Sequence, residues 1–245
     1  NGDATTLEPL RNLLDTYADD FIPSVQVNWD ETDMVSLIKE NSMEPQWKFN
    51  IRTLANRVPG ISQGHLITVG ARSNTGKTSF HASLVMGDGG FADQGANVAV
   101  LCNEESVQRV RMRYINAATG RIGKDILKDV DSNLKVYKEK SKNVKHADAT
   151  AKTMDWVEAV CKRYKPDVLV LDMGDKFAKT STTISTHELL KQNAIHARQI
   201  AKQHECAIFY MSQLAAEAEG RIVLDQSMME GSKTGKAAEA DLILL

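Results

Sequence analysis

From residue 60 onward, short apolar runs alternate with longer stretches whose apolar residues recur every three or four positions. Short, continuous apolar runs are typical of strands that are buried on both faces. They occur at HLITVG (65–70), NVAVLC (97–102), DVLVLD (167–172), AIFYMS (207–212) and DLILL (241–245). The longer stretches predict helices over 79–86, 107–119, 151–164 and 188–204. Strands that alternate with helices predict an α/β fold, with a central, mostly parallel sheet flanked by helices.

The first 50 residues follow a different pattern. A stripe of apolar residues at spacings of three and four predicts an amphipathic helix, formed by Leu7, Leu10, Leu14, Tyr17 and Phe21. A second short helix is predicted over 31–40. We therefore divide the chain into an N-terminal helical linker or subunit-contact segment, 1–50, and a core domain, 51–245. A helix of this kind docks on its own domain or on a neighbouring subunit, and both alternatives stay open.

The stretch GARSNTGKTSF (70–80) follows the first predicted strand and opens a helix. The phosphate-loop pattern G-x-x-x-x-G-K-[ST] requires glycine where Ala71 stands, and Gly70 lies one residue too early. The strand–loop–helix setting nevertheless suits phosphate, because backbone N–H groups and the helix N-terminus point at the anion. Lys77 can reach the β and γ oxygens, and Thr78 can place its hydroxyl on Mg²⁺. We predict a site for ATP, or another nucleoside triphosphate, with Mg²⁺, formed by Ala71, Arg72, Ser73, Asn74, Thr75, Gly76, Lys77, Thr78 and Ser79.

Three further polar positions end predicted strands. Asp172 suits water-mediated binding of Mg²⁺, although an aspartate after a strand is also a common turn or cap residue. Glu104 is the candidate that deprotonates an attacking water, with Glu105 starting the next helix. Both glutamates alternatively complement the dipole of that helix. Gln213 can sense the γ-phosphate.

Two polar segments have different interpretations. Residues 215–241 form a long connection rich in small and charged residues, which is typical of a functional or a disordered loop. Arg221, Lys233 and Lys236 are the candidates there for contacts with a nucleic-acid backbone. Residues 137–150 are predicted to be a solvated loop, and Asp175 to cap the segment that follows Asp172.

Composition limits the remaining classes. The formal net charge is −2, so binding of nucleic acid requires a local basic surface. Three scattered cysteines suit a reduced intracellular protein, and no apolar run approaches the length that spans a membrane. The six histidines lack metal-ligand spacing, so we predict no transition metal bound by the protein. We expect a cytoplasmic protein without a membrane partner.

The motifs together resemble those of the DnaB-like hexameric replicative helicases and the phage primase-helicases. The similar segments are, in order, GARSNTGKTSF with its Ala-Arg opening, CNEES with Arg113, VLVLD, YMSQL and KAAEADLILL, which span roughly residues 50–245. The resemblance implies a RecA-like P-loop NTPase core that assembles as a ring, with six subunits in the family, around single-stranded DNA. It also implies ATP between subunits and 5′-to-3′ movement. The partners it implies are a primase or a helicase loader, in a bacterial cytoplasm or in that of a viral host.

By the same resemblance, Glu104 activates water and Gln213 couples the nucleotide state to DNA. The helix over Leu7–Phe21 resembles the linker helix that packs on a neighbouring subunit. Two features depart from the family: the turn SMMEGSKTGK (227–236) has no arginine before Lys233, and the arginine that acts in trans is expected beyond Leu245. A RecA/RadA-type or KaiC-like ATPase remains an alternative, as does a nucleotide-gated module that binds single-stranded DNA without turnover.

Overall fold

The computed structural model describes residues 33–35, 38, 44–179, 185–229 and 235–245. The chain divides into two compact units, Asn1–Met43 and Glu44–Leu245, so the second unit begins before the predicted boundary at 50/51. The reason is that β1 (Trp47–Lys48) pairs with β2 (Gly60–Ile61) and Phe49 is buried in the core. The predicted helix over Leu7–Phe21 lies outside the described residues. In the predicted helix over 31–40, the described residues Met34, Val35 and Ile38 are helical.

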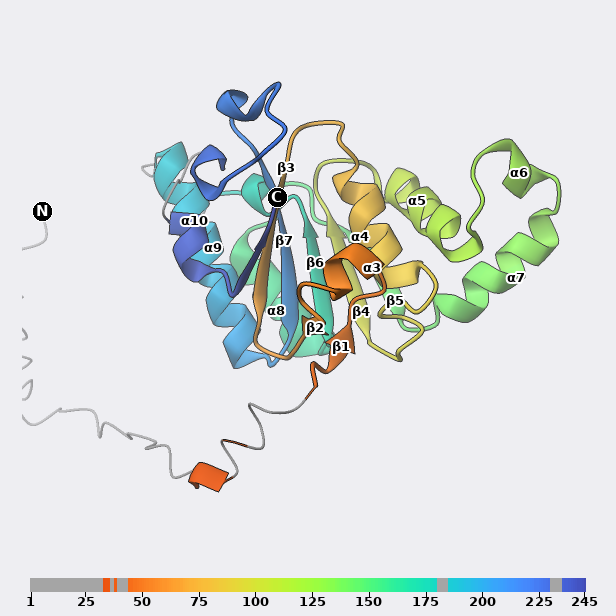
Figure 1. Cartoon of the computed structure of the whole chain (residues 1–245), viewed down its shortest axis with the longest axis horizontal. Coiled ribbons are helices and arrows are strands. Elements are labelled where there is room, and N and C mark those ends of the chain that lie inside the picture. Colours follow the sequence, from red (N-terminus) through yellow and green to blue (C-terminus); the bar gives the residue numbers. More distant parts are fainter. Residues whose placement is uncertain (1–32, 36–37, 39–43, 180–184, 230–234) are drawn as a thin grey trace, which may run out of the picture. The chain divides into compact units, whose positions relative to one another are not determined.

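The second unit is built on a six-stranded sheet with the order β5-β4-β6-β7-β3-β8, and its strands pair in parallel (Figure 1). The strands are β3 (Leu66–Ala71), β4 (Val98–Cys102), β5 (Val144–Asp148), β6 (Val168–Asp172), β7 (Ala207–Gln213) and β8 (Leu242–Leu244). Five of them coincide with the predicted apolar runs, and the α/β fold with a mostly parallel sheet is confirmed.

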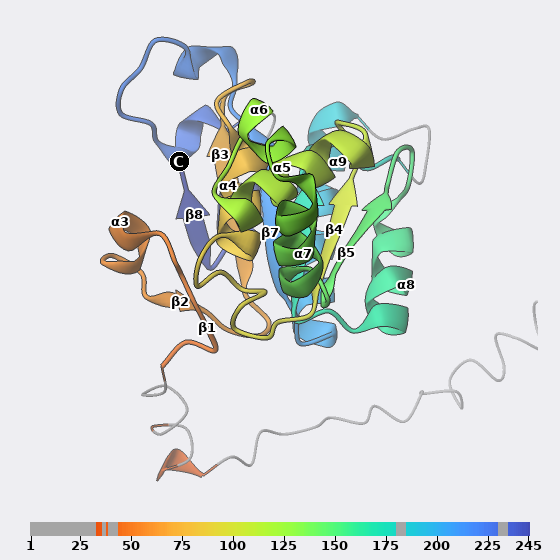
Figure 2. The ribbon, with the colours of Figure 1, turned by 90° about the vertical axis from the view of Figure 1, so that its right-hand side faces the viewer.

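Helices cover both faces of the sheet (Figure 2). Because side chains alternate along a strand, each strand supplies two cores. Ile67, Val100 and Phe209 face α4 (Lys77–Met86) and α5 (Val107–Thr119), whereas Leu66 and Leu101 face the opposite helices. Those helices are α8 (Met154–Tyr164) and α9 (Thr186–Gln203). Full burial of each such side chain stabilises the fold by about 1.5–3 kcal/mol.

The prediction of a solvated loop over 137–150 is wrong. The segment contains the end of α7 (Val130–Lys140) and the whole of β5, and α6 (Lys124–Leu127) precedes α7. β5 is one of the two edge strands of the sheet, and along it Val144 is buried while Lys145 and Asp148 are exposed. A strand with one neighbour and a partly solvated surface has no need of a continuous apolar run, so the sequence pattern carried no strand signal there.

The connection after β7 is partly ordered into short elements, η3 (Ala216–Ala218), η4 (Gln226–Met228) and α10 (Gly235–Glu239). Leu214, Ala218, Met228 and Met229 form a small core, and Ala237 of α10 packs against it. Leu214 also bridges Met229 in antiparallel fashion. Two further short elements are α3 (Arg52–Ala55) and η2 (Gly174–Lys176). None of the described helices is both long and apolar enough to cross a membrane.

Candidate nucleotide-binding site

Parallel pairing brings the candidate residues to one edge of the sheet. Ala71 pairs with Gln213 at the carboxyl ends of β3 and β7, and Cys102 pairs with Asp172 at those of β4 and β6. Glu104 follows β4 by two residues, and the Asn103 amide N–H donates to the Asp172 carbonyl. Ligands of open parallel sheets bind outside the carboxyl ends of the strands. The four segments therefore meet where a ligand is expected.

The loop between β3 and α4 has the backbone conformation of an anion cradle. Asn74 adopts φ 59° and Gly76 adopts φ 98°, which turn the chain tightly before α4 begins at Lys77. The Thr75 hydroxyl donates to the Arg72 carbonyl at 2.7 Å, which closes the loop on itself. The first N–H groups of an α-helix have no intrahelical partner, and Gly76 at the N-cap has no side chain to cap them. This end of α4 is therefore open to phosphate.

Lys77 lies over the same loop. Its ammonium donates to the Ala71 carbonyl at 3.2 Å and to the Arg72 carbonyl at 3.3 Å. The side chain is thus folded back toward the cradle, where it can meet phosphate oxygens. Ser79 is exposed in the first turn of α4, and its carbonyl accepts a hydrogen bond from the Ser83 hydroxyl at 2.9 Å.

Asp172 is a buried carboxylate with 1% exposure. Its Oδ2 accepts from the Thr78 hydroxyl at 3.4 Å and lies 3.4 Å from Nε2 of His81. Burial alone raises the pKa of the Asp172 carboxyl, but hydrogen bonding and charge interactions with His81, and then with Thr78 and Arg113, outweigh it, so the pKa is lowered overall. The carboxylate form, which a cation needs, is therefore favoured.

The other oxygen of Asp172 suits a metal-bound water. Oδ1 is buried and accepts no hydrogen bond from the part of the chain that the structure describes. A buried acceptor left unpaired is costly, and a water of Mg²⁺ would satisfy it. Thr78 lies beside the same carboxylate, so the pair fits a magnesium ion held by one hydroxyl and, through water, by one carboxylate.

Sequence reasoning missed His81. Its ring is 1% exposed, and Nδ1 lies 2.9 Å from the Tyr114 hydroxyl. When the hydroxyl donates to Nδ1, Nε2 carries the ring proton, and it lies 3.4 Å from Asp172 Oδ2 without a hydrogen bond of good geometry. The available signal was a histidine on the second turn of the helix that directly follows the phosphate loop.

The two glutamates after β4 are each paired with a cation. Glu104 accepts from the Lys176 ammonium at 2.8 Å, and Glu105 accepts from the Arg113 guanidinium at 2.7 Å. Glu104 retains 34% exposure of its side chain. Glu105 precedes α5, which begins at Val107. The candidate base thus lies at the mouth of the site, and its neighbour is bound to the following helix.

Gln213 contacts the phosphate loop directly, because its side-chain amide donates to the Ser73 hydroxyl at 2.8 Å. The prediction that Asp175 acts as a local cap is incomplete. Asp175 accepts from the Tyr210 hydroxyl at 3.1 Å, the Ser212 hydroxyl at 2.8 Å and the Gln213 backbone N–H at 3.1 Å. Asp175 therefore ties the end of β6 to the end of β7.

A family model described as the DnaB-like helicase C-terminal domain matches residues 48–241. The chain belongs to this family. One similar solved structure is described as a DnaB-like replicative helicase and its interactions with primase; it has 15% identity and a TM-score of 0.70, with 97% of this chain and 61% of that chain covered. Another is described as an ATPase domain, with 16% identity, a TM-score of 0.70, and 85% of this chain and 79% of that chain covered. No curated protein matches the sequence.

The chain thus spans about three-fifths of the first of these structures, 61%. At such identities the structures show the shared fold, whereas the family model shows the membership. The DnaB-like membership favours the helicase interpretation over a RecA/RadA-type or KaiC-like ATPase.

The structure of this DnaB-like domain corrects one predicted DNA contact. Lys236 is fully buried, and its ammonium lies 2.6 Å from Asp175 Oδ1 and donates to the Ser212 hydroxyl at 3.0 Å. A charge enclosed in this way cannot meet a DNA phosphate, and the surrounding small residues concealed this in the sequence. Arg221 is exposed next to Ile222, whose exposure is 99%. Lys233 lies outside the described residues.

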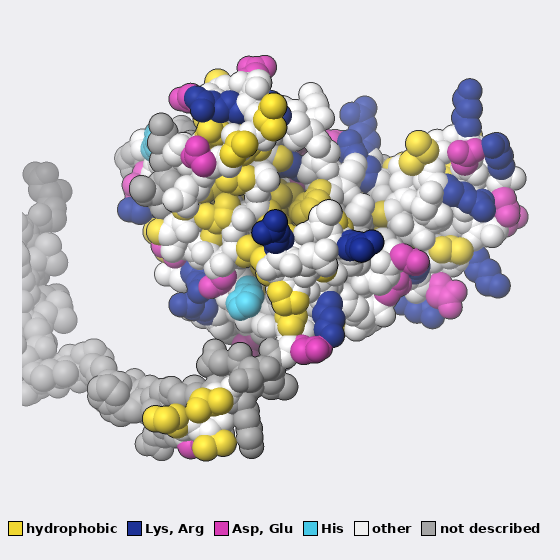
Figure 3. All heavy atoms as spheres, viewed as in Figure 1, with side chains coloured by type: hydrophobic (Ala, Val, Ile, Leu, Met, Phe, Trp, Pro, Cys, Tyr) yellow, Lys and Arg dark blue, Asp and Glu magenta, His cyan; other side chains and the backbone are white. Residues whose placement is uncertain are grey.

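Figure 3 shows basic, acidic and hydrophobic side chains side by side over the segment that follows β7, at the top of the view. A cavity of about 560 Å³ lies at the base of that segment and is lined by Arg72, Ser73, Thr75, Gln213 and Leu214, among others. It joins the helicase domain's phosphate loop to the connection after β7.

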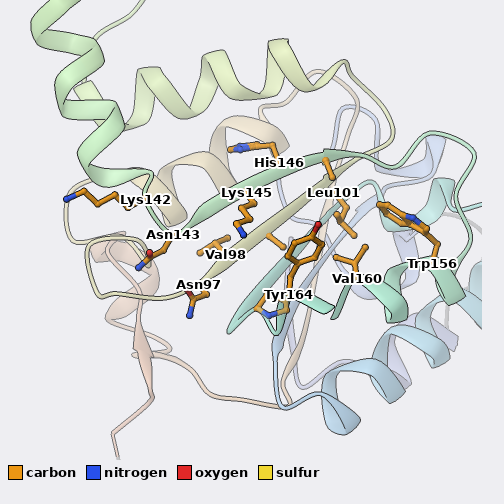
Figure 4. Close-up of a pocket in the computed structure, with 13 residues that line it drawn as sticks. Asn97, Val98, Leu101, Lys142, Asn143, Lys145, His146, Trp156, Val160 and Tyr164 are labelled. Atoms are coloured by element: carbon orange, nitrogen blue, oxygen red, sulfur yellow. The ribbon is translucent and has the colours of Figure 1, made fainter. Parts of the chain in front are cut away.

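Another cavity, of about 600 Å³, lies between β4, β5 and α8 (Figure 4). Lys145, Trp156 and Tyr164 line it, and none of the predicted site residues does. The phosphate loop, Asp172 and Gln213 instead meet at the carboxyl edge of the sheet.

Proposed function

We propose that this chain is the motor of a replicative DNA helicase, which hydrolyses ATP and translocates 5′ to 3′ on single-stranded DNA to unwind the duplex. The observation that carries the proposal is the contact set at the carboxyl edge. There Thr78 touches Asp172, and Gln213 touches Ser73 of the phosphate loop. Membership of the DnaB-like family supports the choice of DNA as the track.

Binding and chemistry divide among the residues of the loop and the strand ends. The backbone of residues 71–79 and the Lys77 ammonium bind the phosphates. Thr78 and, through water, Asp172 hold Mg²⁺, which supplies charge stabilisation to the transferring phosphoryl group. Glu104 accepts the proton of the attacking water. Its pairing with Lys176 keeps the carboxylate oriented at the mouth of the site.

Gln213 is the proposed sensor of the nucleotide. Its side-chain amide is hydrogen-bonded to Ser73, so it can follow the position of the phosphate loop. The segment that carries Arg221 comes directly after it in the chain. An exposed arginine neutralises phosphate without reading the base sequence. Lys233 remains a second candidate for that contact, whereas Lys236 is fully buried and is not a candidate.

Assembly into a hexameric ring is proposed because the second unit exposes apolar residues on α6, α7 and the turn before them. Ile122 is 70% exposed and Leu127 is 72% exposed, and hydrophobic side chains lie among charged ones in that part of Figure 3. This surface suits the predicted apolar stripe over Leu7–Phe21 of a neighbouring subunit. A primase or a loader is the further partner that we propose, in the cytoplasm of a bacterium or of a viral host.

The test is ATP hydrolysis by the full-length protein with and without single-stranded DNA. We expect DNA to stimulate hydrolysis, and Lys77→Ala to abolish both the basal and the stimulated rate. Lys202→Ala, an exposed lysine of α9, is the matched control and should leave both unchanged. ATP binding without turnover would support the nucleotide-gated binding module instead, and a rate indifferent to DNA would contradict a DNA motor.

A further inference from the structure

A buried ion pair joins the nucleotide-sensing strand end to α10. The Lys236 ammonium lies 2.6 Å from Asp175 Oδ1, with 0% and 9% exposure of the two side chains. The same carboxylate accepts from the backbone N–H of Gln213, and the same ammonium donates to Ser212. The two charged groups thus form hydrogen bonds with the last two residues of β7, Ser212 and Gln213.

A buried ion pair holds two elements together only at a large cost in desolvation free energy. Removing both charges from water costs several kcal/mol per ion, and apolar residues of similar volume stabilise a core at least as well. The pair is tolerated because the remaining lone pairs of Asp175 are filled by Tyr210, Ser212 and Gln213. The ion pair resists separation of its two groups, since pulling them apart leaves both charges buried and unpaired.

The position of α10 depends on contacts of this kind. A helix of five residues, Gly235–Glu239, is too short to be stable by itself. Lys236 binds it to Asp175 on one side, while Ala237 packs against the small core of Leu214, Ala218, Met228 and Met229. A displacement of Lys236 therefore displaces that core, and with it the exposed residues Arg221 and Ile222.

On the other side, the pair reaches the phosphate loop in two steps. Asp175 holds the Gln213 backbone N–H at 3.1 Å, and the Gln213 side chain holds the Ser73 hydroxyl at 2.8 Å. The contacts form a continuous path from the loop that binds phosphate to the segment after β7: Ser73, Gln213, Asp175, Lys236 and the small core.

We propose that the Asp175–Lys236 ion pair is the positioning device that transmits the nucleotide state from Gln213 to the DNA-contacting segment, an inference that rests on the proposed function. A shift of Gln213 with its nucleotide moves its backbone N–H, and Asp175 follows to keep that hydrogen bond. Lys236 follows Asp175 because the buried pair resists separation. Neither residue touches nucleotide or DNA, so both act through the position of others.

The experiment measures the affinity of the full-length protein for a fluorescent oligo-dT with ATP and without nucleotide, by anisotropy. The ratio of the two dissociation constants is the coupling between the sites, and by linkage DNA changes the ATP affinity by the same factor. The test variant is the double substitution Asp175→Asn with Lys236→Met, which removes both charges and leaves none unpaired. The wild type should show a ratio of about fivefold or more, and the double variant a ratio near one.

Two controls separate coupling from general loosening. ATP affinity without DNA should stay within about twofold in the double variant, because neither residue lines the phosphate loop. Arg198→Met breaks a partly exposed ion pair with Asp241, just before β8, that touches neither Gln213 nor Asp175. It should retain the wild-type ratio although it also loosens the fold.

The outcomes are distinct. A folded double variant that keeps the wild-type ratio overturns the inference while the proposed function stands. A wild type whose DNA affinity ignores ATP overturns both. If the double variant does not fold, Lys236→Met alone decides, because Tyr210, Ser212 and Gln213 still donate to Asp175 while its link to α10 is lost. That variant should lower the ratio several-fold, and an unchanged ratio would again reject the inference.

Discussion

His146 is held uncharged below the nucleotide site. It lies on the edge strand β5, and the edge of its ring packs against Tyr114 with the centroids 4.4 Å apart. Burial, and then electrostatic interactions with Arg111 and His81, lower the pKa of His146 from 6.5 to about 4. Its ring therefore stays neutral at pH values where the ring of an unfolded chain is protonated.

The direction of the pH effect follows from this shift. Above pH 6.5 the folded and unfolded chains both carry a neutral His146, so the group contributes no pH dependence. As the pH falls from 6.5 toward 4, the unfolded chain gains a proton that the folded chain refuses, and the free energy of unfolding decreases. Integrating between these two pKa values gives a loss of about 2 kcal/mol at pH 5, and the loss levels off once the folded chain is protonated as well.

The assay is denaturant unfolding at pH 8 and pH 5, on the wild type and on His146→Phe, which keeps an aromatic ring against Tyr114. The wild type should lose about 2 kcal/mol more than the variant between the two pH values. His187→Phe, an exposed histidine on α9, is the matched control and should retain the wild-type pH dependence. Equal losses in the wild type and His146→Phe, or a His146 imidazole that titrates near the ordinary histidine pKa of 6.5, would refute the reasoning.

Two further substitutions test the site. Gly174→Ala places a Cβ 2.5 Å from Cζ of the buried Tyr210, so we expect a loss of about 1–3 kcal/mol in the free energy of unfolding, and an unchanged melting temperature would contradict this packing. Glu104→Gln should lower the rate of ATP hydrolysis by about 100-fold or more while ATP still binds. Glu205→Gln, an exposed glutamate just after α9, is its control, and a Glu104→Gln variant with wild-type turnover would remove Glu104 from the role of base.

Local signals in the sequence account for most of the sheet and for the phosphate loop. β3, β4, β6 and β7 are apolar runs because both of their faces are covered, β8 is an apolar edge strand that is half-buried, and α5 begins and ends where its apolar spacing predicts. The phosphate loop could be predicted despite Ala71, because the strand before it and the helix after it set the direction of the backbone N–H groups. β5 was not predicted, because it is an edge strand with a partly solvated surface and such a strand tolerates polar residues.

The residues that the sequence did not reveal share one physical property, which is that each is polar and buried against a partner distant in the chain. His81 meets Asp172 and Tyr114, and Lys236 meets Asp175. A histidine or lysine between small residues looks solvated until the fold brings its partner near. Because a buried polar group without a partner is costly, each such residue marks a pair that the fold must keep. In this domain both pairs lie directly behind residues of the nucleotide site. Buried polar pairs therefore identify supporting residues that sequence motifs leave out. The ratio of DNA affinities with and without ATP, measured on the Asp175–Lys236 double variant, tests whether such a pair transmits the nucleotide state in addition to stabilising the fold.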